Sequence, residues 1–302
     1  MANLKEVRLR IESVNSTKQI TSAMKMVAAS KLRKSQNAIT ALRPYAEKLN
    51  EIMMRVSKTQ TLTQTLTQTQ TGGRVLIIPI SSNKGLCGVF NANVIRATIN
   101  LIKEEYQTYL DDDKLDILCV GSKIEESLKF KKYPVIGNEN VLLDKLTYNN
   151  AASFAERLIR DFETKNYDKI VFVYNQFKNA ATQLIVSEQF LPTTNSQQPT
   201  ANSQQPTAQE SLSSSSSDYI FQPNIDELYN EILPKSLKMQ VYKILLDSYA
   251  SEQGARMVSM TQATDNATEL LKELNLSYNK ARQGAITNEL VEIVSGAEAL
   301  KG

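Results

Sequence analysis

Hydrophobic residues recur every three or four positions at both ends of the chain, which is the spacing of side chains on one face of an α-helix. At about 1.5 Å per residue, helices over 4–57 and 224–295 would be roughly 80 Å and 105 Å long, too long for a compact domain. Pro44 is expected to kink or interrupt the first helix,. The N-terminal stripe consists of Leu4, Val7, Ile11, Val14, Ile20, Met24, Val27, Ala28, Leu32, Ile39 and Leu42. The C-terminal stripe consists of Met260, Ala263, Ala267, Leu271, Leu274, Tyr278, Ala281 and Ala285, followed by Ile286, Leu290, Ile293 and Ala297.

Each terminal stretch carries a single apolar stripe, and a single stripe is buried most simply against another helix. The chain returns through its middle, so the two stripes predict an antiparallel coiled coil. Small residues such as Ala263 and Ala267 would allow the helices to approach closely.

Between the two helical stretches, short apolar runs alternate with helical patterns. Strands are expected at 75–80, 115–120, 168–174 and 181–190, and helices at 91–110, 123–130 and 151–162. Strands that alternate with helices predict a partly parallel sheet with helices on its faces. The predicted fold class is α/β, with a long antiparallel coiled coil of the N- and C-terminal helices plus a small, Rossmann-like central domain.

Two segments have low-complexity sequences. Residues 59–71 read TQTLTQTLTQTQT, and residues 193–217 contain NSQQPTA twice and end in a run of serines. Such compositions indicate a linker and a disordered surface insertion. The predicted organisation is an N-terminal shaft helix (1–58), a linker (59–73), the α/β domain (74–192), the insertion (193–217) and a C-terminal shaft helix (218–302).

The composition excludes several kinds of site. The chain has no His, so a His-dependent catalytic triad or zinc site is excluded,. Its two cysteines, Cys87 and Cys119, are far apart and are interpreted as reduced thiols of a cytosolic-type compartment,. The N-terminus resembles neither a signal peptide nor a transit peptide, and no apolar window is long enough to span a membrane. We expect no cofactor and no metal.

Residues 13–46 contain no Asp or Glu but carry six basic side chains. Such a stretch favours an acidic partner or phosphates. Three interpretations remain open: a nucleic-acid-binding coiled coil, a solvated helix face, and a match to acidic loops of a surrounding protein. Aromatic residues are absent between Ser13 and Pro44, which weakens the first interpretation,. The six are Lys18, Lys25, Lys31, Arg33, Lys34 and Arg43.

The sequence SSNKGLCGVFN at residues 81–91 follows an expected strand and precedes an expected helix. A phosphate-binding loop and a small-molecule enzyme are one hypothesis, but neither GxGxxG nor GxxxxGK[ST] is present. A tight turn that needs Gly85 and Gly88 is the favoured interpretation. Cys87 has no His to activate it as a nucleophile. The carboxylates of 111–113 are consecutive, which is typical of a solvated turn and not of a metal site.

Three stretches together resemble one family, the gamma subunit or central stalk of F-type ATP synthases. They are IESVNSTKQITSAMKMVAASKLRKS (11–35), SSNKGLCGVFN (81–91), and SEQGARMVSMTQATDNA (251–267) with YNKARQGAITNELVEIVSGAEAL (278–300). The resemblance covers nearly the whole chain except the two low-complexity segments.

This resemblance implies a rotor that works mechanically and is not itself an enzyme. The implied partners are the alpha and beta subunits of the ATPase ring, the epsilon subunit and the c-ring. The implied location is peripheral, at the cytoplasmic face of a bacterial inner membrane, with no nucleic acid bound. By their match to family positions, the residues implied to contact the catalytic ring are Met24, Lys25, Arg256, Gln283, Thr287 and Glu289.

The chain also departs from the family pattern. Asn83 stands where the family usually has Asp, and Gly254 and Gly284 replace a more usual Ala. Because each Gly costs about 1 kcal/mol of helix propensity relative to Ala, we expect slightly softer shaft segments at both positions. The insertion at 193–217 has no Cys, so thiol regulation through it is not expected.

Overall fold

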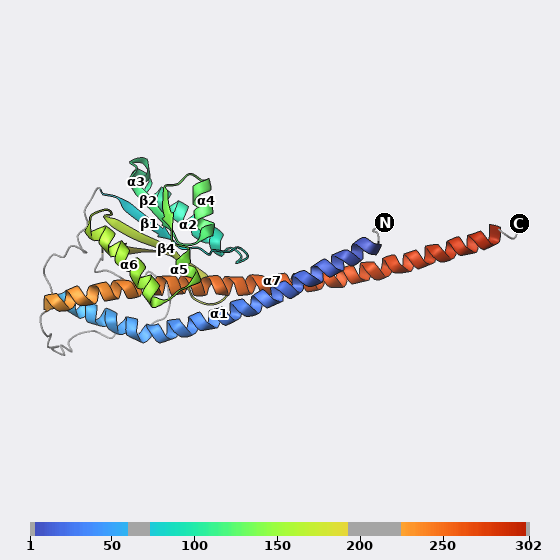
Figure 1. Cartoon of the computed structure of the whole chain (residues 1–302), viewed down its shortest axis with the longest axis horizontal. Coiled ribbons are helices and arrows are strands. Elements are labelled where there is room, and N and C mark those ends of the chain that lie inside the picture. Colours follow the sequence, from blue (N-terminus) through green and yellow to red (C-terminus); the bar gives the residue numbers. More distant parts are fainter. Residues whose placement is uncertain (1–3, 60–72, 193–224, 300–302) are drawn as a thin grey trace, which may run out of the picture.

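The computed structural model describes residues 4–59, 73–192 and 225–299. Most of the predicted linker and the whole 193–217 insertion lie outside these residues. Helix α1 (Leu4–Thr59) and helix α7 (Ile225–Ala299) lie side by side and run in opposite directions, with the remaining elements gathered on one side of them (Figure 1). The predicted fold class, a long antiparallel helical pair with an α/β domain, is confirmed.

The two long helices pack through narrow stripes. Along α1, Val7, Ala28 and Leu32 are buried, while most other positions of the helix are exposed. Along α7, Met260 and Ala267 are buried in the stripe that the sequence predicted. A hydrogen bond of 2.8 Å from the Thr264 hydroxyl to the Thr21 hydroxyl oxygen crosses the interface. The periodicity therefore locates the contact surface over much of each helix. Ile20 and Val27 of the predicted stripes are exposed, and so is the last part of the C-terminal stripe, from Ala285 to Ala297.

The interruption expected at Pro44 does not occur, since α1 is continuous through it. Pro44 lies on the exposed side of the helix, whereas Leu49 nearby is buried. A proline removes one backbone hydrogen bond, and the helix continues in spite of this loss.

A five-stranded mixed sheet forms the centre of the α/β domain, in the order β3-β2-β1-β4-β5. The first four strands in the chain are parallel, and β5 runs antiparallel to β4. The sequence missed β3 and helix α5, which are too short to show a period. The strands are β1 (Val75–Pro79), β2 (Leu115–Cys119), β3 (Val135–Asn138), β4 (Lys169–Phe177) and β5 (Gln183–Leu191). The remaining helices are α2 (Phe90–Glu105), α3 (Gln107–Asp111), α4 (Ser122–Phe130), α5 (Val141–Asp144) and α6 (Tyr148–Glu163).

Helices cover both faces of the sheet. Val75 and Ile77 of β1 belong to a core cluster that includes residues of α2 and α4. The intervening Leu76 and Ile78 belong to the opposite cluster, to which α6 and the first part of α7 contribute. From α7 this cluster takes Leu233, Leu237, Val241, Ile244 and Leu245.

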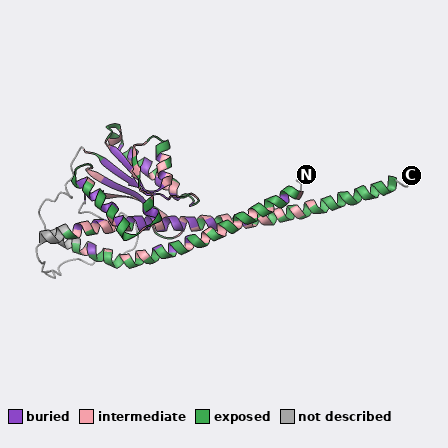
Figure 2. Ribbon diagram, in the orientation of Figure 1, coloured by how far each residue is buried: buried purple, intermediate pink, exposed green. Residues whose placement is uncertain are grey.

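Helix α7 is thus a covering helix of the sheet in its first part and a shaft helix in the rest, as its burial shows (Figure 2). The α/β domain is therefore built directly onto the shaft. Within the described residues, every helix falls short of the sustained hydrophobicity that a membrane span requires.

Candidate functional site

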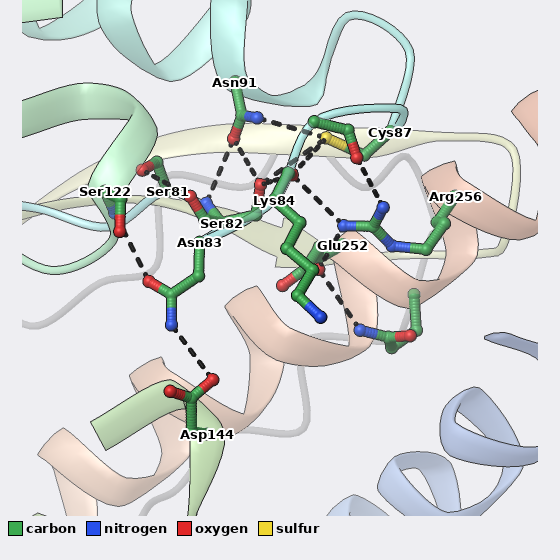
Figure 3. A network of polar contacts seen from close by, with 12 residues as sticks. Ser81, Ser82, Asn83, Lys84, Cys87, Asn91, Ser122, Asp144, Glu252 and Arg256 are labelled. Atoms are coloured by element: carbon green, nitrogen blue, oxygen red, sulfur yellow. Dashed lines mark hydrogen bonds and ion pairs between the residues drawn. The ribbon is translucent and has the colours of Figure 1, made fainter. Parts of the chain in front are cut away.

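Arg256 lies on α7 just beyond the part that packs on the sheet, and it is only 8% exposed. Its guanidinium donates to the backbone carbonyl of Gly85, to that of Lys84 at 3.3 Å, and to Glu252 Oε1 at 2.6 Å (Figure 3). Arg256 therefore ties the shaft to the loop between β1 and α2. The guanidinium is the charged donor best suited to several acceptors at once.

Glu252, one helical turn before Arg256, is equally buried. Loss of solvation raises the pKa of the Glu252 carboxyl, while the hydrogen bond and charge of Arg256 act in the opposite direction,. A buried carboxylate of this kind is tolerated because a cation pairs with it. The pair is thus a structural unit, in which loss of the arginine would leave a buried charge.

The loop between β1 and α2 is folded on its own side chains. Asn91 Oδ1 accepts from the backbone N–H of Ser82 at 3.0 Å, and the Ser82 hydroxyl donates to the carbonyl of Lys84 at 2.6 Å. Asn91 Nδ2 lies 3.2 Å from the sulfur of Cys87. These contacts fix the path of the loop independently of its contact with α7.

Asn83 joins this loop to two others at the carboxyl end of the parallel strands. Its Nδ2 donates to Asp144 Oδ1 at 3.1 Å and to the carbonyl of Asn140 at 3.0 Å. Its Oδ1 accepts from the backbone N–H of Ser122 at 3.3 Å (Figure 3). The loops that follow β1, β2 and β3 are therefore locked together at the edge where open α/β sheets commonly bind ligands.

Gly88 is the glycine that this turn requires. It has a φ of +60°, and a Cβ there would lie 2.7 Å from the Ser259 hydroxyl oxygen of α7. Gly85, in contrast, has open space where a Cβ would lie. The carbonyls of Lys84 and Gly85 point at a guanidinium, which is the opposite polarity to a phosphate cradle, where backbone N–H groups face the ligand.

The loop presents apolar side chains to solvent beside this junction. Leu86 is 66% exposed and Val89 65% exposed. Exposed apolar side chains on a rigid loop are typical of a contact surface for another protein.

Met24 and Lys25 of α1 are both half-buried. Met24 lines a cavity of about 340 Å³ together with Lys84, Glu252 and Arg256. The structure therefore brings Met24 and Arg256, which are far apart in the sequence, to one place where α1, α7 and the loop meet.

Gln283, Thr287 and Glu289 lie elsewhere, on the part of α7 that extends past the N-terminal end of α1 (Figure 2). All three are exposed, as is every residue of 282–299. The Thr287 hydroxyl donates to the Gln283 carbonyl at 2.9 Å within the helix. Large apolar side chains are exposed on the same segment, namely Ile286, Leu290, Val291, Ile293 and Val294.

Metal-ligating clusters and the two cysteines are the remaining candidates for chemistry. No group of three or more potential metal-ligating side chains occurs among the described residues. Cys87 and Cys119 are both buried, and burial raises the pKa of the Cys119 thiol to about 12. A thiol that stays protonated is a poor nucleophile.

Sequence reasoning missed Ser82, Asn83, Asn91, Asp144 and Glu252 as members of the junction. The available signal was weak: polar residues follow a buried strand directly in SSNKGLCGVFN, and Glu252 stands four positions before Arg256. Such a spacing is also ordinary for an exposed helix pair. Their roles depend on contacts between distant segments.

Comparisons with known proteins were consistent over the whole chain. A model of the family described as ATP synthase matches residues 3–300. The ATP synthase gamma chain of Flavobacterium johnsoniae is 50% identical over 100% of both chains, and that of Cytophaga hutchinsonii is 43% identical over 99% of both.

Solved structures agree with these matches. The central stalk and c-ring of Tetrahymena thermophila mitochondrial ATP synthase provides a chain with 25% identity and a TM-score of 0.55, covering 81% of this chain and 99% of that one. The rotor of Euglena gracilis mitochondrial ATP synthase provides another, with 19% identity and a TM-score of 0.63, covering 94% and 98%. The latter shows similarity of fold.

Proposed function

The chain belongs to the ATP synthase gamma chain family, and from this membership we propose that it is the central rotor shaft of a proton-translocating ATP synthase. Its long helices turn inside a ring of ATPase subunits. Rotation presents different faces of the shaft to each catalytic site, and a site responds because its conformations differ in their affinity for those faces.

The single observation that carries this proposal is the bare end of α7. Residues 282–299 extend beyond α1 and expose five large apolar side chains on one helix. A single helix with this surface needs an enclosing partner. A sleeve formed by the alpha and beta subunits would provide it, with Gln283, Thr287 and Glu289 as polar contacts.

The middle of the shaft supports a second set of contacts. Met24 and Lys25 lie in the basic part of α1, which attracts acidic loops of the catalytic subunits,. Arg256 takes part indirectly, since its guanidinium is used to hold the loop that carries Leu86 and Val89. We therefore assign Arg256 to positioning this loop.

The remaining assignments follow from the family. The chain itself is non-catalytic, and its α/β domain joins the shaft to the epsilon subunit and the c-ring. It is held peripherally at the cytoplasmic face of the inner membrane through that ring.

Co-purification tests the proposal. The full-length chain, co-expressed with the other ATP synthase subunits, should be recovered with a tagged beta subunit. Deletion of residues 283–302 should lower ATP-driven proton pumping of membrane vesicles roughly fivefold, the effect of about 1 kcal/mol of lost contact energy.

The matched control is Lys131→Ala, a change at an exposed residue of the α/β domain, which should leave pumping unchanged. A full-length chain that never accompanies the beta subunit, although both are expressed and folded, would contradict the rotor assignment. Normal pumping by the deletion would contradict the role given to the end of α7.

A further inference from the structure

A second cavity, of about 510 Å³, lies between α1, the end of β4 and α7. In this region α1 bows away from α7 (Figure 1). Its walls include Arg43 and Glu47 of α1, Lys178 after β4, and Lys243 and Asp247 of α7. Charged side chains of both shaft helices thus line this cavity.

Asp247 is the unusual member of this cavity. It is only 6% exposed, and among the residues that the structure describes it makes no hydrogen bond or ion pair. Loss of solvation raises the pKa of its carboxyl to about 6. A buried carboxylate without a partner is rare, because burial is tolerated only when the charge is neutralised or paired.

The charged groups that face Asp247 come from every neighbouring element. Lys243 of α7 and Arg43 of α1 favour its ionised form, and Glu188 of β5 opposes it. Glu188 is already engaged, since it accepts from the Tyr174 hydroxyl at 2.7 Å and from Gln240 Nε2 at 2.7 Å. Lys243 and Arg43 therefore remain the available partners for Asp247. Two further charged residues, Glu47 and Lys178, also line the cavity.

We propose that Asp247 and Arg43 form a proton-linked latch between the two shaft helices. When Asp247 is ionised, its charge attracts the Arg43 guanidinium across the cavity, with help from Lys243, and α1 closes on α7. When Asp247 carries a proton, this attraction is lost and α1 stays apart from α7.

The direction of the pH effect follows from linkage. Burial raises the pKa of Asp247 in the open form, whereas pairing with Arg43 in the closed form lowers it again,. The closed form therefore releases a proton, so closure is favoured as pH rises, with a midpoint at or below about pH 6. If closing lowers the pKa by about one unit, the ratio of closed to open molecules rises roughly tenfold over the titration.

The inference goes beyond the rotor assignment and does not depend on it. A stiffer contact between α1 and α7 at this level would change how firmly the shaft carries the α/β domain. The pH of the solution around the cavity would then set the stiffness of the shaft.

The test is a distance measurement between spin labels on the purified full-length chain. Labels attached at Ala41→Cys of α1 and Leu184→Cys of β5 lie at exposed positions outside the cavity wall. The native thiols of Cys87 and Cys119 are 1% and 0% exposed, so they are protected from labelling. Between pH 5 and pH 8 the shorter-distance population should increase.

Two variants identify the groups responsible. Asp247→Asn has nearly the same shape and should abolish the pH dependence, and Arg43→Gln, at an exposed position, should prevent closure at every pH. Lys34→Gln removes an α1 cation that lies outside the cavity wall and should leave the response intact. Distances independent of pH in the labelled chain that carries no further substitution, or an unchanged response in Asp247→Asn, would overturn the proposal.

Discussion

At the scale of single residues, Asn83 illustrates how one amide determines the shape of the junction. It donates through Nδ2 to Asp144 and Asn140 and accepts through Oδ1 from Ser122. A carboxylate at this position would keep the accepting role but could not donate. The amide is therefore matched to Asp144 as its neighbour.

Replacement of Asn83 by Asp should destabilise the chain by about 1–3 kcal/mol, because it removes two donated hydrogen bonds and brings two carboxylates together. Thermal unfolding at pH 7 is the measurement. The double variant Asn83→Asp/Asp144→Asn places the donor on the opposite side and should recover most of the loss. Equal stability of the single variant and the parent would show that the amide makes no difference.

At the scale of elements, α7 is one helix with two different packing partners, the sheet and α1. Its first part buries residues such as Leu237 and Ile244 under the sheet, whereas Met260 and Ala267 face α1. The sequence predicts the same softening at Gly254 and Gly284, but the two glycines have different surroundings. A Cβ at Gly254 would lie 3.2 Å from the Cα and carbonyl oxygen of Ala180, while Gly284 has open space.

Gly284→Ala should stabilise its segment by about 1 kcal/mol, the difference in helix propensity. Gly254→Ala should gain less or lose stability, because the backbone at Ala180 would have to move. Hydrogen exchange of the two α7 segments in the assembled complex distinguishes them. The same increase in protection for both variants would refute the packing argument at Gly254.

At the scale of the whole molecule, the α/β domain is joined to the shaft by the hydrogen bonds that the buried Arg256 of α7 donates to the carbonyls of Gly85 and Lys84. Arg256 and Glu252 are both 8% exposed, and the arginine reaches the loop after β1. The domain therefore has a specific connection to the shaft in addition to its hydrophobic contact with α7.

Arg256→Gln should cost about 3 kcal/mol of unfolding free energy, since it leaves Glu252 buried without a cation. The double variant Arg256→Gln/Glu252→Gln should be less damaged, because the unpaired charge is gone. Urea unfolding at pH 8 and pH 5 provides a further check. The single variant should recover partly at pH 5, where the carboxyl, whose pKa is already raised, takes up a proton. A double variant as unstable as the single one would contradict this account.

The sequence by itself determined the long helices, their shared stripes and most strands, because these features depend on the spacing of apolar residues within one segment. It also indicated the family, through motifs at 11–35, 81–91 and 251–267. It could not identify β3 or α5, since four residues carry no readable period.

Only the tertiary structure decided which distant residues come together at the junction and in the cavities. Arg256 finds its acceptor at Gly85 across 171 positions of sequence, and Asp247 shares a cavity with Arg43 of the other shaft helix. Periodicity describes which face of a helix is apolar, but it does not tell which distant backbone atoms approach that face. The partner contacts at Met24, Lys25 and the end of α7 remain predictions for the same reason, because they depend on surfaces of other chains.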